Sequence, residues 1–199
     1  VDDLRRRLPV LGRIVVQVDE PLLAAVVAGE VPTASGWGRL RTYEKAEVED
    51  VLRRVVAAAS PPPAAEGEEA PGIAGVWIGA TNLDGALLRG AGARFIGIDG
   101  AVLDTVDEDQ VGEAIDAGVG LLVACVPHDA RQTDPRPFME PVRSLWKRLG
   151  FLPELLPTAV AVAPVEGLEQ LAVGDVPAVL RRAVAAGRYL EESAADEES

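Results

Sequence analysis

Five short runs rich in valine and isoleucine, separated by stretches with helical spacing, restrict the fold more than any other feature of this sequence. The apolar residues within each run are consecutive rather than alternating with polar ones, which is typical of strands buried on both faces of a sheet. The runs occupy residues 13–18, 73–78, 94–98, 120–126 and 158–163.

Amphipathic patterns occupy the stretches between the runs and the stretch after the last one. Residues 44–59 place an apolar face of Val48, Val51, Leu52, Val55, Val56 and Ala59 opposite charged side chains, as a surface helix requires. Further helices are predicted at 107–115, 138–149 and 175–190. In the second of these, Pro141 fits only if it belongs to the first turn. Strands that alternate with helices predict parallel β-α-β units joined by right-handed crossovers, and so an α/β layer or barrel.

The net charge of −13 is concentrated outside the expected folded body. Three of the 32 acidic residues lie in the Pro-rich segment 60–72 and five in residues 191–199, which leaves 24 acidic against 19 basic residues. The scattered arginines form no basic stripe, so nucleic acid is not an expected partner. We expect one domain over residues 1–190, with a disordered loop at 60–72 and an acidic tail at 191–199.

A single cysteine, Cys125, and a single histidine, His128, limit the covalent and metal chemistry. They exclude a disulfide framework within the chain and a structural Cys/His zinc site. The longest charge-free run, residues 70–83, is shorter than the roughly 18 to 20 apolar residues that span a bilayer. With no secretory pattern at the start, the sequence predicts no membrane partner and a cytoplasmic location.

Polar or ionisable side chains follow four of the five runs. The carboxyl ends of parallel strands meet at one edge of a sheet, so these side chains are candidates for binding a cation or an amino group. Three of them also have a simpler interpretation. Asp19 would cap the helix beginning near Leu22, Asp99 would start a turn with Gly100, and Glu166 would be a solvated loop residue. The candidates are Asp19, Glu20, Asp99, His128, Asp129 and Glu166.

Three segments resemble one known family. Residues 16–23, VQVDEPLL, resemble the strand-end Q-x-D-E-P segment in the catalytic domain of cobalamin-independent methionine synthases. Residues 85–93 resemble the helix after the second metal-bearing strand of short family members, and residues 164–168 resemble their P-x-C-G-L strand end. The three segments occur in the family's order over about 150 residues.

This resemblance implies a (β/α)8 barrel and transfer of a methyl group from a methylated folate to the sulfur of homocysteine. With five strands, the chain is expected to form a partial or truncated TIM-type barrel, or alternatively an open doubly wound parallel sheet. Asp19 and Glu20 match the segment beside the amino-acid substrate, where Asp19 would accept hydrogen bonds from the ammonium group. His128 is the catalytic candidate, because a strand-end histidine in this region transfers a proton in some members.

The family's zinc ligands are a histidine, a cysteine two positions later, an acidic residue and a final cysteine. Here these positions fall at Trp77, Gly79, Asp99 and Glu166, and only Asp99 is retained in kind. A thiolate-rich zinc site is therefore not expected, and no cofactor is predicted. Cys125 lies inside an apolar run, so we expect it to pack as a small buried side chain.

Three functional hypotheses follow. The first is a methionine-synthase-like methyltransferase, impaired or inactive as this chain alone because its zinc ligands are missing. The second is a non-catalytic relative that binds a small amino acid or a protein partner. The third is a magnesium or manganese site built from Asp19, Asp99 and Glu166, with or without His128. A barrel usually needs about 250 residues. We therefore expect that the chain is a fragment, that it completes its barrel with a partner chain or by self-association, or that its sheet closes differently.

Overall fold

The computed structural model describes residues 2–7, 14–60, 72–79, 84–129 and 131–197. Most of the loop expected at 60–72 lies outside these ranges. The chain divides into two compact units: unit 1 comprises residues 1–78 and 83–96, and unit 2 comprises residues 79–82 and 97–199. The expectation of a single domain over 1–190 stays a prediction.

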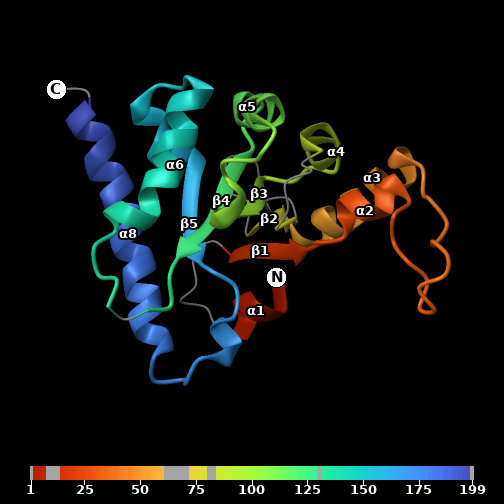
Figure 1. The fold of residues 1–199 in the computed structure, drawn as a ribbon, viewed down its shortest axis with the longest axis horizontal. Coiled ribbons are helices and arrows are strands. Elements are labelled where there is room, and N and C mark those ends of the chain that lie inside the picture. The colour runs from red at the N-terminus through yellow and green to blue at the C-terminus, as the bar shows by residue number, and fades with distance from the viewer. Residues whose placement is uncertain (1, 8–13, 61–71, 80–83, 130, 198–199) are drawn as a thin grey trace. The chain divides into compact units, whose positions relative to one another are not determined.

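The elements alternate between strand and helix along most of the chain (Figure 1). Unit 1 contains α1 (Asp2–Arg7), β1 (Ile14–Asp19), α2 (Leu23–Ala28), α3 (Lys45–Ala59), β2 (Gly72–Trp77), α4 (Gly85–Gly90) and the start of β3 (Phe95–Asp99). Unit 2 contains the end of β3, then η1 (Gly100–Val102), α5 (Glu108–Asp116), β4 (Gly120–Val126), α6 (Arg136–Leu149), η2 (Pro153–Leu155), α7 (Leu156–Ala159), β5 (Val160–Pro164), η3 (Leu168–Gln170) and α8 (Val176–Glu197). The four helices predicted from amphipathic patterns are confirmed as α3, α5, α6 and α8.

The strands form a parallel sheet in the sequential order β1-β2-β3-β4-β5. Within unit 1, β1 pairs in register with β2, from Ile14 opposite Gly72 to Asp19 opposite Trp77. Within unit 2, β4 pairs with β5, with an irregularity between Ala124 and Val126. The predicted α/β class with five parallel strands is confirmed. Since a doubly wound sheet reverses its strand order at a switch point, the sequential order favours the barrel-type winding.

Strand β1 corrects the expectation that every run is buried on both faces. Its side chains alternate between the two faces, with Ile14 buried, Val15 60% exposed and Gln17 exposed. It is the first strand of the sheet and pairs only with β2 among the described strands. A consecutive apolar run therefore did not distinguish a strand at the edge from the central strands β2, β3 and β4, which are largely buried.

Helix α3 packs against β2 and α4 in unit 1. Glu44 and Glu47 form a capping box at its start, and Leu52 and Val56 are its buried residues. Arg53 Nε donates to the Gly90 carbonyl at 3.1 Å, and Lys45 Nζ lies 2.7 Å from an Asp84 carboxylate oxygen. These contacts fix α3 against α4 and leave the rest of its broad apolar face available for another neighbour.

Helix α6 shows that the expectation for Pro141 was wrong. The first turn contains Pro137, whereas Pro141 lies inside the helix. A proline there removes one backbone hydrogen bond. The helix continues because Met139, Val142 and Trp146 are buried on its inner face, and such packing supplies most of a helix's stability in a folded protein.

Helix α8 packs against β5 and extends to Glu197. Most of the segment expected to be an acidic tail is thus the last part of this helix. No helix in the ranges given above combines the length and apolar character needed to cross a membrane.

Candidate functional site

The carboxyl end of β1 carries the two predicted substrate-binding residues of unit 1. Asp19 is exposed and accepts a hydrogen bond from Gln17 Nε2 at 2.7 Å. Gln17 and Asp19 are two residues apart, so their side chains lie on the same face of the strand. The backbone N–H of Glu20 donates to the Trp77 carbonyl at 2.8 Å, which anchors the chain just beyond the strand end.

The alternative role of Asp19 as a helix cap is wrong. The N-cap residue of α2 is Leu22, and no side chain caps that helix. The second Asp19 carboxylate oxygen has no hydrogen bond among the described residues. A ligand that donates to an exposed carboxylate could therefore bind there without displacing an internal contact.

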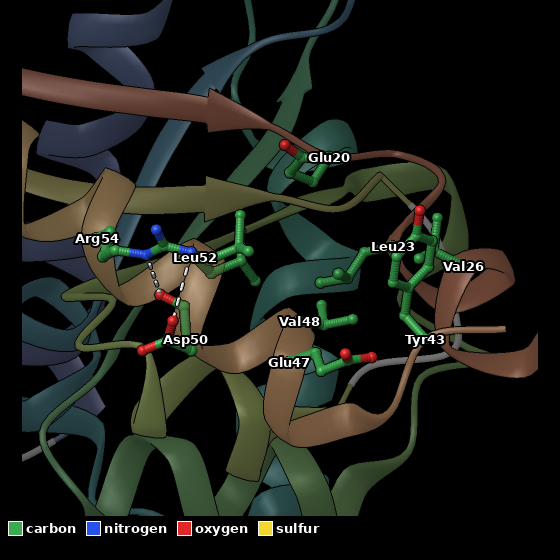
Figure 2. Close-up of a pocket in the computed structure, with 10 residues that line it drawn as sticks. Glu20, Leu23, Val26, Tyr43, Glu47, Val48, Asp50, Leu52 and Arg54 are labelled. Atoms are coloured by element: carbon green, nitrogen blue, oxygen red, sulfur yellow. Dashed lines mark hydrogen bonds and ion pairs between the residues drawn. The ribbon is translucent and has the colours of Figure 1, made fainter. Parts of the chain in front are cut away.

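Glu20 faces a different environment from Asp19. Its side chain lines a pocket of about 510 Å³ in unit 1 between α2 and α3 (Figure 2). The figure shows Leu23, Val48 and Leu52 around this pocket, with Glu20 on one side and the Asp50–Arg54 ion pair on another. Within the described ranges, the Glu20 carboxylate makes no hydrogen bond or ion pair.

Two of the family's zinc positions carry no ligand. Trp77 is buried in β2, with 5% of its surface exposed. Gly79 follows that strand with a positive φ of 62°, a backbone conformation that favours glycine. An indole and a glycine offer no donor that zinc accepts, so the first two positions do not fit the metal.

Asp99 acts as a cap in unit 2. Its Oδ1 accepts a hydrogen bond from the Ala101 N–H at 2.9 Å, and Asp99 is the N-cap residue of η1. The simpler interpretation of this residue as part of a turn with Gly100 is the one that the geometry supports. Glu166 is exposed on the loop after β5.

Cys125 is partly buried in β4, with its sulfur 3.8 Å from Met139 Sδ. Burial raises the pKa of the Cys125 thiol to about 12. Because the thiolate is the nucleophile and the metal ligand, this cysteine is protonated and unreactive near neutral pH. Its expected role as a small packing side chain agrees with this environment.

His128 lies on the loop after β4 and is partly buried. Its Nε2 donates to the Val165 carbonyl at 2.9 Å, so the proton of the neutral ring is on Nε2. Arg182 of α8 fixes the backbone at this histidine. Its Nη2 donates to the Pro127 carbonyl at 3.2 Å and to the His128 carbonyl at 2.9 Å. Only Nδ1 of this ring remains available to accept a proton.

A metal centre built from these residues is not supported. Among the residues with described positions, no group of three or more His, Cys, Asp or Glu side chains is arranged to hold a metal ion. The hypothesis of a cation site from Asp19, Asp99 and Glu166 joins residues of both units and stays a prediction. The candidates instead fall into two sets: Asp19, Glu20 and Trp77 in unit 1, and Gly79, Asp99, His128 and Glu166 in unit 2.

Sequence reasoning missed the pocket between α2 and α3 and the buried Arg182. The sequence contained one indication of the pocket, because the apolar face predicted for α3 is wider than packing against the core requires. In the structure, Val51 and Val55 of that face are 51% and 42% exposed. Arg182 had no such signal, because an arginine in an amphipathic helix is usually solvated.

Comparison with family models, with curated proteins and with solved structures found no match to this chain.

Proposed function

We propose that this chain is a methionine-synthase-like α/β domain that binds a small amino acid at the carboxyl end of β1 without zinc-dependent catalysis. The observation that carries the proposal is the Gln17–Asp19 pair, in which one carboxylate oxygen is held and the other is open. We also propose that the protein is cytoplasmic and that it binds neither nucleic acid nor membranes.

The recognition chemistry is that of an ammonium group meeting a fixed carboxylate. An ammonium has three N–H donors and no acceptor, which suits the Asp19 carboxylate and the side-chain oxygen of Gln17. The Gln17 N–H group orients the carboxylate before the ligand arrives, so little side-chain freedom is lost on binding. Because Asp19 is exposed, each such contact contributes about 1 kcal/mol or less. Two contacts fall short of the roughly 4 kcal/mol that a 1 mM dissociation constant needs, so we expect binding weaker than about 1 mM.

The absence of a soft donor set argues for binding without methyl transfer. A free thiol has a pKa of about 8.5 and is mostly protonated near neutral pH. Zinc would lower that pKa, but Trp77 and Gly79 cannot ligate it and Asp99 is engaged as a cap. The residues present therefore do not fit zinc.

Methyl transfer from a methylated folate to homocysteine is the second candidate. What favours it, besides the family resemblance, is His128, whose ring is oriented by Val165 and whose Nδ1 can accept a proton. Under this hypothesis His128 would take the thiol proton at Nδ1 as the sulfur attacks the methyl group. The bond between the methyl carbon and the folate nitrogen would break, and the folate nitrogen would keep its electron pair and take up a proton.

Titration calorimetry with L-methionine tests the proposal. We expect weak binding by the wild type, loss of binding in Asp19→Asn, and no binding of N-acetyl-methionine, which lacks the ammonium group. Asp116→Asn, which removes an exposed carboxylate at the end of α5, is the matched control and should bind as the wild type does. Equal binding by Asp19→Asn and the wild type would refute the assignment. Formation of methionine from homocysteine and a methylated folate by the isolated chain would favour the second candidate.

A further inference from the structure

Unit 1 contains a groove that the amino-acid proposal does not use. This groove is the 510 Å³ pocket between α2 and α3, with Leu23, Val26, Val48 and Leu52 among its lining residues (Figure 2). Asp19 and Glu20 are adjacent in an extended chain, so their side chains point in different directions. A pocket within the range of roughly 300 to 1,000 Å³ accommodates a group as large as an aromatic ring.

The groove is acidic at its rim. Glu20, Glu47 and Asp50 line it, and Arg54 is the only basic residue among its described lining residues. Asp50 is paired with Arg54 at 3.3 Å, and Glu47 with Arg41 at 3.2 Å. The Glu20 carboxylate has no partner in the described part of unit 1, which leaves one negative charge beside an apolar surface.

The same unit carries a well-defined hairpin between α2 and α3. Pro32 and Arg39 form an antiparallel bridge, and Leu40 N–H donates to the Val31 carbonyl at 2.8 Å. Thr33 N–H donates to the Gly38 carbonyl at 2.8 Å, and Gly38 N–H donates to Thr33 Oγ1 at 3.2 Å. These bonds close the turn and fix the direction of the residues at its tip.

Trp37 at the tip of this hairpin is 96% exposed. The other two tryptophans, Trp77 and Trp146, are buried. Burial of an exposed indole would be strongly favourable through the hydrophobic effect. Tryptophan is also among the residues most enriched at the hot spots of protein interfaces. Arg39, next to the tip, is exposed and has no ion pair within the described ranges.

We propose that the groove of one copy of this chain takes the Trp37 indole of a second copy, with Arg39 approaching Glu20 across the interface. The two surfaces are complementary in kind, since one is aromatic and basic and the other is apolar and acidic. Both lie on unit 1, so a two-fold symmetric pair would make the contact twice. This association is independent of amino-acid binding at Asp19.

Sedimentation velocity over a micromolar dilution series tests the dimer. We expect a reversible dimer for the wild type, and a monomer for Trp37→Ala and for Val51→Asp, which places a charge at the groove without removing a core residue. Val173→Asp is the matched control, because Val173 is an apolar residue of unit 2 that is 89% exposed; this variant should remain dimeric.

Tryptophan fluorescence measures the same event at the proposed contact. Since Trp37 is the exposed tryptophan, its emission should shift to shorter wavelength and its quenching by iodide should fall as the concentration rises. Trp37→Phe should remove both changes.

Charge reversal tests the pairing of Arg39 with Glu20. Glu20→Arg and Arg39→Glu should each weaken the dimer by about fivefold or more, and the double variant should restore most of the affinity. A wild type that stays monomeric, or a dimer that Trp37→Ala leaves unchanged, would overturn the proposal. A monomer whose groove binds tryptamine would assign the groove to a small ligand and would equally overturn the dimer.

Discussion

Gly75 shows how a single residue can carry a packing requirement that a sequence pattern hides. It lies in β2, and a Cβ at this position would overlap the carbonyl oxygen and the ring of Phe95. Glycine inside a strand is otherwise unfavourable, so here it is retained because the neighbouring backbone comes very close. The pattern predicted the strand correctly but not the reason for its glycine.

Two glycine substitutions should therefore change stability in opposite directions. Gly75→Ala should lower the free energy of unfolding by about 1 to 3 kcal/mol, the usual effect of overpacking. Gly187→Ala should raise it by about 0.5 to 1 kcal/mol, because Gly187 lies inside α8 with open space around its Cα. Urea unfolding measures both; a Gly75→Ala variant as stable as the wild type would contradict the close approach.

Cys125 should make the stability depend on pH in the alkaline range. Its pKa is raised from 9.0 to about 12 by burial, so between these values the unfolded chain loses a proton that the folded chain retains. The contribution of this thiol is fully present below pH 9 and is lost as the pH rises toward 12. The free energy of unfolding of the wild type should fall more steeply in this range than that of Cys125→Ala, in which other titrating groups are unchanged. Parallel curves for the two proteins would show that the thiol is not shielded.

At the scale of elements, the periodic helices were predictable and the strand environments were not. Segments 44–59, 107–115 and 138–149 formed helices close to their predicted limits, and the helix predicted at 175–190 continues to Glu197. A wide apolar stripe fixes both the period and the buried face of such a helix. The expected strand at 158–163 begins at Val160, after α7. A short apolar run does not distinguish a strand from a helical turn without its neighbours.

Arg182 is the contact through which α8 fixes the end of β4. It is 9% exposed, its Nη2 donates to two backbone carbonyls, and its Nε has no partner in the described structure. Arg182→Ala should lower the free energy of unfolding by about 2 to 4 kcal/mol, because two partly buried backbone carbonyls lose their donor. The neighbouring exposed residue gives the control, Arg181→Ala, which should change stability by about 0.5 kcal/mol or less. Equal effects of the two substitutions in urea unfolding would contradict the anchoring role.

The whole molecule has the α/β class and the five parallel strands that the sequence predicts. The site was predicted less completely. Asp19 and Glu20 lie at the strand end as expected, but the sequence did not indicate that Glu20 lines a pocket while Asp19 is exposed. Such differences depend on how α2 and α3 pack, which local patterns do not specify. Completion of a barrel by self-association or by a partner chain remains a prediction at this scale.

The central claim is amino-acid recognition without a metal, and calorimetric titration of metal-free protein with L-homocysteine, before and after addition of zinc, tests it most directly. The account predicts weak binding through the ammonium group with the same dissociation constant in both conditions, and no stoichiometric uptake of zinc. Binding that appears only after one equivalent of zinc has been taken up would contradict the account, because it would require a thiolate-binding centre that Trp77, Gly79, Asp99 and Glu166 do not provide.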